Sequence, residues 1–286
     1  MDILISVGLP LGLAFIMFSL GVGLTVGDFV RVSQRPGAFF VGGLNQMILL
    51  PLIAFFCIRL FVLTDELAVG VMILSACPGG VTSNIITRLA KGDVALSVSL
   101  TAVISLASVV TVPLILAFAL STFMGADAPP VNIAATALTM FALTVVPVLL
   151  GLSARHIAPT QIVKAEPYLA RAATILFVLI ISSALAASWS LFVANIPRLG
   201  PVLVLLLTLL TAIGFALPRF AGRTKTEAKT ISIETGVQNG TLGIAIASLL
   251  IGEEAGFSAY ALPSAVYGIV MYLIIVPVIL VYRRMD

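Results

Sequence analysis

Residues 77–84 read Cys-Pro-Gly-Gly-Val-Thr-Ser-Asn and lie in the middle of an apolar run from residue 67 to residue 91. The run is long enough to cross a bilayer, which takes roughly 20 apolar residues in a helix. Proline lacks the backbone N–H that a helix needs, and the two glycines after it add backbone freedom. These residues predict a helix that is interrupted in mid-membrane. A continuous helix with a proline kink is the alternative interpretation.

A second polar stretch lies within the apolar run of residues 226–251. Residues 234–239 read Glu-Thr-Gly-Val-Gln-Asn. Glu234 is the only acidic residue that we place deep in the hydrophobic region, where a charge is costly unless it faces a polar cavity or a partner. The sequence therefore predicts a second interrupted helix. The alternative is that Glu234 lies in water at the cytoplasmic end of the span, because Lys229 comes shortly before it.

Composition extends this interpretation to the whole chain. Of its 286 residues, 60% are hydrophobic and only 9% are charged, whereas soluble domains have about 25% charged residues. We predict an all-α polytopic membrane protein, with residues 1–286 forming a single transmembrane transporter domain. The nine predicted transmembrane helices lie at residues 3–26, 37–63, 67–91, 94–123, 131–156, 167–194, 199–220, 226–251 and 257–282. Pro167 and Pro201 are expected at or near helix starts, where proline is tolerated.

The basic residues set the orientation of these spans, because lysine and arginine are concentrated on the cytoplasmic side of membrane proteins. With nine spans, 13 of the 15 Lys and Arg residues fall on one side. We therefore expect the N-terminus outside and the C-terminus in the cytoplasm. We also expect the plasma membrane as the location (the inner membrane in a bacterium) and no nucleic-acid partner, although the net charge is +3.

In this topology the two interrupted spans cross the membrane in opposite directions. That arrangement is typical of inverted-repeat transporters, and we assign residues 3–123 to a first repeat and residues 131–282 to a second. Each break exposes carbonyl groups that suit a cation and N–H groups that suit a carboxylate. One site in mid-membrane is therefore predicted to bind sodium and a small organic anion together.

Oxygen-bearing side chains near the breaks are candidate ligands for sodium, a hard cation. They are Ser97, Thr101, Ser105 and Ser108 on one face of the fourth span, Ser83, Asn84 and Glu234 at the breaks, and Asn45 and Gln46 in the second span. Small hydroxyl residues also allow close helix packing, and amides also join helices, so both interpretations stay open. Two sodium ions and one monoanion would neutralise an ionised Glu234, which favours a stoichiometry of two sodium ions.

The residues around both breaks resemble the bile acid:sodium symporter family in its bacterial form. The resemblance lies in residues 77–84, in residues 88–101 (Arg-Leu-Ala-Lys-Gly-Asp-Val-Ala-Leu-Ser-Val-Ser-Leu-Thr) and in residues 234–239, and it extends over nearly the whole chain. It implies a panel domain and a core domain, with two discontinuous helices that cross in the core. Bacterial members have ten helices, and we expect this chain to begin at their second.

The resemblance also implies site residues. One sodium ion would be bound by Ser83, Asn84, Ser97, Thr101 and Glu234, and a second by Gln46, Glu234 and Gln238 with the backbone carbonyls of Thr235 and Val237; Val81, Thr82 and Asn239 would face the substrate crevice. Bacterial members often have Gly-Gly-Thr-Ala-Ser-Asn, so Val81 and Thr82 reverse the polar and apolar positions. This departure leaves the sodium ligands intact and leaves the substrate open among bile-acid-like compounds, pantoate and other carboxylates.

Other function classes are alternatives to symport. A metalloid or arsenite efflux permease of related fold would use Cys77 as a soft ligand at the break. A membrane sensor that does not transport is a further alternative. We expect no enzyme, because the sole histidine, His156, lies at a cytoplasmic end and no pair of acids lies at membrane depth. We expect no cofactor besides sodium, and a monomer in the lipid bilayer.

Overall fold

The computed structural model describes residues 8–34, 36–63, 65–129, 132–187, 189–251 and 258–285. Within these ranges the chain forms helices and no strands. In chain order the elements are α1 (Leu9–Gly23), α2 (Val26–Gln34), α3 (Pro36–Leu44), η2 (Asn45–Leu49), α4 (Leu50–Leu60), α5 (Asp65–Ala76), α6 (Val81–Leu89), α7 (Val94–Phe123), η3 (Gly125–Asp127), α8 (Ile133–Met140), η4 (Phe141–Val145), α9 (Val146–Ile157), α10 (Pro159–Ala187), α11 (Trp189–Phe220), α12 (Lys225–Gly236), α13 (Gly240–Ile251) and α14 (Leu262–Arg283).

Six segments of the described chain are long and apolar enough to cross a membrane. They are Pro36–Leu60, Val94–Phe123, Ile133–Ile157, Pro159–Ser183, Trp189–Phe220 and Leu262–Arg283, and they match six of the predicted spans. The third and eighth predicted spans are each present as two shorter helices, α5 with α6 and α12 with α13. The first predicted span is represented by α1, and its residues 3–7 lie outside the described residues. The same holds for residue 131 of the fifth span, residue 188 of the sixth and residue 257 of the ninth.

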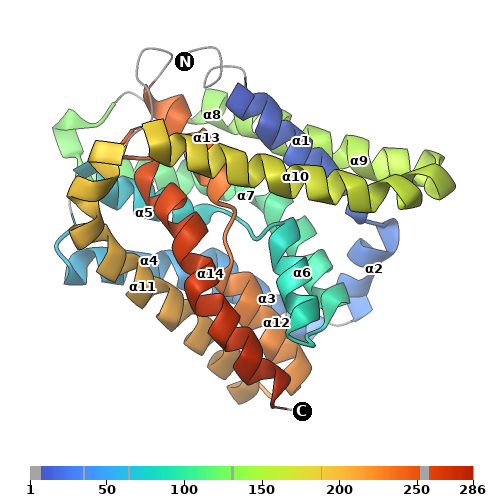
Figure 1. Cartoon of the computed structure of the whole chain (residues 1–286). Coiled ribbons are helices and arrows are strands. Elements are labelled where there is room, and N and C mark those ends of the chain that lie inside the picture. The colour runs from blue at the N-terminus through green and yellow to red at the C-terminus, as the bar shows by residue number, and fades with distance from the viewer. Residues whose placement is uncertain are drawn as a thin grey trace.

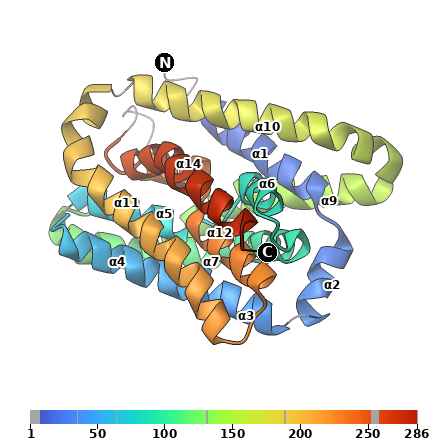
Figure 2. The same cartoon turned by 60° about the horizontal axis from the view of Figure 1, so that its bottom comes forward.

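Two helices begin earlier than the sequence predicted. α10 starts at Pro159 instead of residue 167, and α11 starts at Trp189 instead of residue 199. The expectation that Pro167 and Pro201 mark helix starts was wrong, because both prolines lie inside these helices. A proline bends a helix without ending it when the freed carbonyl finds another partner. Figure 2 shows α11 bent near its start.

Three helices, α1, α9 and α10, pack side by side along one flank of the molecule (Figures 1 and 2). Glycines allow the closest approach in this layer. A Cβ atom on Gly21 of α1 would lie 2.1 Å from the carbonyl oxygen of Val148, and a Cβ on Gly151 of α9 would lie 2.3 Å from that of Phe18. Small residues let membrane helices come into backbone contact, so these two positions fix how α1 and α9 pack.

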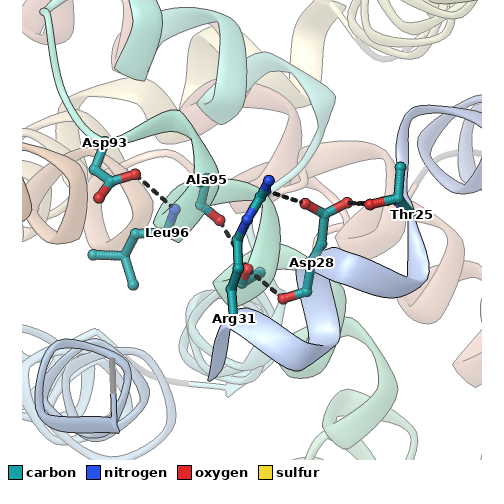
Figure 3. A network of polar contacts seen from close by, with 7 residues as sticks. Thr25, Asp28, Arg31, Asp93, Ala95 and Leu96 are labelled. Carbon is teal, nitrogen blue, oxygen red and sulfur yellow. Dashed lines mark hydrogen bonds and ion pairs between the residues drawn. The ribbon is translucent and has the colours of Figure 1, made fainter. Parts of the chain in front are cut away.

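The short helix α2 connects α1 to α3 and is fastened to α7 (Figure 3). Asp28 accepts hydrogen bonds from the backbone N–H and the hydroxyl of Thr25, both at 2.7 Å, and pairs with Arg31 at 2.7 Å. The hydroxyl of Ser99 on α7 donates to the carbonyl of Asp28 at 2.6 Å. Capping by Asp28 therefore starts α2, and Ser99 fixes it against the neighbouring helix.

Two spans contain a π-helical turn, and a proline follows each turn closely. Residues Asn45–Leu49 form η2 before Pro51, and Phe141–Val145 form η4 before Pro147. A proline cannot donate to the carbonyl four residues earlier, and a wider turn removes the clash while keeping the helix continuous. π-helical turns are frequent at functional sites, and η2 contains Gln46.

The packing of α1 against α9 gives a direct test. Gly21→Ala should lower the melting temperature by several degrees, because its Cβ meets the backbone of Val148, and overpacking of this kind costs about 1–3 kcal/mol. Gly43→Ala is the matched control, since a Cβ at Gly43 meets no atom within 4 Å. Thermal unfolding of the purified protein checks both variants. Equal melting temperatures for the two would contradict the packing described.

Candidate ion and substrate site

The two interrupted spans meet at their breaks. α5 ends at Ala76 and α6 starts at Val81, while α12 ends at Gly236 and α13 starts at Gly240. The backbone N–H of Asn239 donates to the carbonyl of Pro78 at 2.9 Å, which joins one break to the other. Figure 1 shows α5–α6 and α12–α13 crossing there. The predicted interruptions are confirmed, and a continuous kinked helix is excluded for both spans.

Gly79 allows the two breaks to approach each other. A Cβ atom at this position would lie 2.8 Å from Oε2 of Glu234 and 3.0 Å from the hydroxyl oxygen of Ser83. Any other residue would push these side chains away. The glycine in the Pro-Gly-Gly sequence thus leaves room for the carboxylate as well as interrupting the helix.

A buried carboxylate with hydroxyl partners lies beside the crossing. Glu234 is 4% exposed, and its carboxylate accepts hydrogen bonds from Ser97 and, at 2.7 Å, from Thr101. The hydroxyl of Ser97 also lies 2.8 Å from Oδ1 of Asn84, and that of Ser83 lies 3.5 Å from the hydroxyl of Thr101. The alternative that Glu234 sits in water at the end of a span is therefore wrong.

These five residues come from three helices. Ser83 and Asn84 lie on α6, Ser97 and Thr101 on α7 and Glu234 on α12. The structure thus gathers the residues predicted for the first sodium ion into one cluster, which we call the carboxylate cluster. Each of the five side chains offers an oxygen atom, the donor type that hard cations prefer.

A second polar cluster lies on the other side of Gly79, and we call it the amide cluster. The side-chain N–H₂ of Gln46 donates to Oε1 of Gln238 at 2.9 Å and to the carbonyl of Cys77 at 3.3 Å. The N–H₂ of Gln238 donates to the carbonyl of Thr235 at 2.7 Å. A Cβ on Gly79 would lie 3.5 Å from the carbonyl oxygen of Val237, so this carbonyl also faces the crossing.

One acceptor of the amide cluster has no partner. Oε1 of Gln46 is buried and accepts no hydrogen bond from any described residue. An unpaired buried oxygen costs about 1–3 kcal/mol, and a bound cation would satisfy it. A narrow space lined by Gly42, Gln46, Gly79, Thr101 and Glu234, together with Leu100 and Ile104, joins the two clusters. Gln46, one of the residues predicted for the second sodium ion, therefore lines the same space as Glu234.

A separate small pocket opens between the crossing and the flanking layer. It is lined by Ile16 of α1, Ala173, Thr174 and Phe177 of α10, and Gly80, Thr82, Gln238 and Asn239 at the breaks. Thr82 and Asn239, predicted to face the substrate, lie in this lining. Val81 begins α6, and its side chain lies outside the described part of the structure.

The sequence reasoning missed the residues of α1 and α10 in this pocket. Ile16, Ala173 and Phe177 are ordinary membrane residues, and no local pattern distinguishes the face of a helix that lines a pocket from a face that touches lipid. No Lys, Arg or His lies among the residues that line the pocket. The charge of an anion bound there would instead meet the N-terminal ends of α6 and α13.

Cys77, the candidate soft ligand, lies at the break with its thiol hydrogen-bonded to the preceding helix α5. Its buried thiol donates to the carbonyl of Ile73 at 3.3 Å. The described residues contain no group of three or more His, Cys, Asp or Glu side chains that could hold a metal ion. The geometry therefore gives no support to thiol-based recognition of a metalloid.

Comparison with known proteins shows matches along most of the chain. Residues 10–195 match the sodium bile acid symporter family. The probable sodium/metabolite cotransporter BASS2, chloroplastic, of rice is 31% identical over 92% of this chain, which spans 60% of that relative's length. The uncharacterized sodium-dependent transporter YocS of Bacillus subtilis is 29% identical over 93% of this chain and 79% of its own length. The human ileal sodium/bile acid cotransporter is 30% identical over 89% of this chain and 72% of its own length.

The carboxylate cluster predicts how single hydroxyl groups contribute to cation binding. Ser97→Ala removes a hydroxyl that contacts both Glu234 and Asn84, so the sodium concentration that gives half-maximal thermal stabilisation should rise by about tenfold or more, which corresponds to about 1.4 kcal/mol. Ser108, a candidate from the sequence that is not among the five residues of the carboxylate cluster, serves as the control in Ser108→Ala. Its buried hydroxyl donates to the carbonyl of Ser105 on the same helix. If the half-maximal sodium concentration of Ser97→Ala equals that of Ser108→Ala, Ser97 does not take part in binding the ion.

Proposed function

Since the chain belongs to the sodium bile acid symporter family, we propose that it is a secondary transporter that couples the entry of sodium to uptake of a small organic anion. Sodium-dependent transport is the activity named in its relatives. One observation supports the coupling most directly: a buried glutamate lies with serine, threonine and asparagine oxygens beside two helix breaks.

Two sodium ions fit the arrangement of polar groups. The carboxylate cluster offers five side chains for one ion. The amide cluster offers Gln46, Gln238 and the carbonyls of Thr235 and Val237 for the other, and Glu234 is shared between them. Two ions and one monoanion would neutralise the charge of Glu234, so the loaded site would cross the low-dielectric interior without net charge.

The proposed transport cycle uses the two groups of helices as moving parts. The layer of α1, α9 and α10 corresponds to the panel domain, and the helices around the crossing correspond to the core domain. We infer that the two halves of the chain are inverted repeats, that the N-terminus faces outside, and that the protein acts as a monomer in the plasma membrane. Alternating access would then arise from movement of the core against the panel around the site.

A carboxylate is the substrate chemistry that suits the pocket best. Asn239 offers an amide N–H₂, and the N-terminal ends of α6 and α13 offer backbone N–H groups and a positive dipole. The apolar residues Ile16, Ala173 and Phe177 would contact a short hydrocarbon portion. The relatives are named for metabolites and bile acid, and the small pocket favours a small carboxylate for this chain.

Uptake into proteoliposomes tests the function. A panel of small carboxylates, with bile acids included, should reveal a substrate whose uptake requires an inward sodium gradient and is not supported by potassium. Glu234→Gln should abolish this uptake, because it removes the shared charge. Glu227→Gln is the control, since Glu227 lies at the exposed start of α12. Transport of a metalloid that Cys77→Ser abolishes and that removal of sodium leaves unchanged would instead support the metalloid efflux permease.

A substitution at Asn239 can distinguish the binding of the substrate from the binding of the ions. Its Oδ1 accepts from the N–H of Leu242 at 3.1 Å and so caps α13. Asn239→Asp keeps this acceptor and introduces a negative charge in the pocket. Uptake of the anion at low concentration should fall by about tenfold or more, because a like charge at short range costs at least about 1.4 kcal/mol there. The midpoint of sodium-dependent stabilisation should not rise, because a negative charge beside a cation does not weaken its binding. A raised sodium midpoint together with lost uptake would contradict the separation.

A further inference from the structure

Three carbonyl groups at the end of α12 each accept a hydrogen bond from a different partner. The carbonyl of Ile233 accepts the N–H of Val237 at 2.8 Å, and that of Thr235 accepts the side chain of Gln238 at 2.7 Å. The carbonyl of Gly236 accepts the hydroxyl of Tyr267 at 2.7 Å. A helix that ends inside a membrane has no water to satisfy its last carbonyls, so each of these bonds determines where one peptide group points.

Tyr267 reaches the break from the second turn of α14. Its side chain is fully buried and is among the largest fully buried side chains of the described chain. The same helix also touches the other end of the break, because a Cβ on Gly240 would lie 2.8 Å from the carbonyl oxygen of Ser264. The start of α14 therefore supports both sides of the gap between α12 and α13.

The carbonyl that Tyr267 holds belongs to Gly236, the last residue of α12. Gly236 cannot be replaced by a larger residue, because a Cβ there would lie 2.7 Å from the methyl group of Thr211. Glycine, however, allows a wide range of backbone angles. Gly236 lies between Thr235 and Val237, whose carbonyls are predicted ligands of the second sodium ion. Rotation at Gly236 would turn both of these carbonyls.

We propose that Tyr267 is a positioning residue for ion coupling: its hydroxyl fixes the Gly236 peptide and thereby directs the carbonyls of Thr235 and Val237 toward the cation. The proposal rests on the proposed function, since it assigns a role within the same ion site. The bond also occupies the Gly236 carbonyl, so that this oxygen does not compete for the cation. Tyr267 itself binds the backbone and not the ion.

A second tyrosine on the same helix provides a matched control. The hydroxyl of Tyr282 lies 2.7 Å from that of Ser232, and the Ser232 hydroxyl donates to the carbonyl of Thr211 at 2.6 Å. Tyr282 therefore also links α14 to α12, one turn before the break. Tyr282→Phe and Tyr267→Phe each remove one buried hydroxyl between the same two helices, and only Tyr267→Phe frees a peptide next to the predicted ligands.

The test measures thermal unfolding of the purified full chain during a titration with sodium chloride, with potassium chloride keeping the ionic strength constant. Both tyrosine variants should unfold at lower temperature than the wild type. In Tyr267→Phe the half-maximal sodium concentration should rise about fivefold, which corresponds to about 1 kcal/mol. In Tyr282→Phe it should stay at the wild-type value. Tyr267→Met, in which a flexible apolar side chain fills the same space, should behave as Tyr267→Phe does.

Each outcome has a distinct meaning. A raised sodium midpoint in either Tyr267 variant, with an unchanged midpoint in Tyr282→Phe, supports the proposal. If both Tyr267 variants keep the wild-type half-maximal sodium concentration, the positioning proposal is overturned and the proposed function stays intact. If sodium and potassium stabilise the wild type equally, the proposed function itself is contradicted. If neither Tyr267 variant folds while Tyr282→Phe does, Tyr267 is required for the fold itself, and a specific positioning role is likewise overturned.

Discussion

A carboxylate withdrawn from water inside a membrane protein needs partners, and Glu234 imposes this constraint on the rest of the structure. Its side chain is 4% exposed and has hydroxyl donors from α7. Taking a charge into low dielectric is costly unless hydrogen bonds or counter-charges compensate. The polar residues of α6 and α7 form one cluster because the carboxylate of α12 must be satisfied there. This requirement explains why so apolar a chain keeps several hydroxyl side chains at one depth.

The same need for polar partners applies to the backbone groups at the two breaks. A continuous helix uses all of its interior carbonyl and N–H groups, and only an interruption makes them available at mid-membrane. Each freed group must then find a partner, because lipid provides none. The bond from Asn239 to Pro78 and the bond from Tyr267 to Gly236 are two such partners. The crossing therefore pairs these backbone groups within the protein and leaves Oε1 of Gln46 available to an ion.

Local sequence predicted the features that have a local cause. Proline and glycine at residues 78–80 indicated the first break, and Glu234 in an apolar run indicated a buried polar cluster; the structure confirms both. Pro167 and Pro201 misled the prediction of helix starts, because a proline ends a helix only where its freed carbonyl lacks another partner. The pocket residues Ile16 and Phe177 were missed for a different reason. Their role depends on which helices become neighbours, and the sequence of one helix does not indicate which other helices pack against it.

The position of Gln238 gives a physical reason for ion and anion binding to depend on each other. Its Oε1 accepts from Gln46 and its N–H₂ holds the carbonyl of Thr235, while the same residue lines the pocket beside Asn239. An amide oxygen has two lone pairs, so Oε1 of Gln238 could keep the hydrogen bond from Gln46 and contact a cation that also binds the unpaired Oε1 of Gln46. A cation held by this amide would place positive charge beside the pocket that Gln238 lines. In the proposed mechanism an anion in the pocket would be stabilised by that charge, and its affinity would depend on bound sodium.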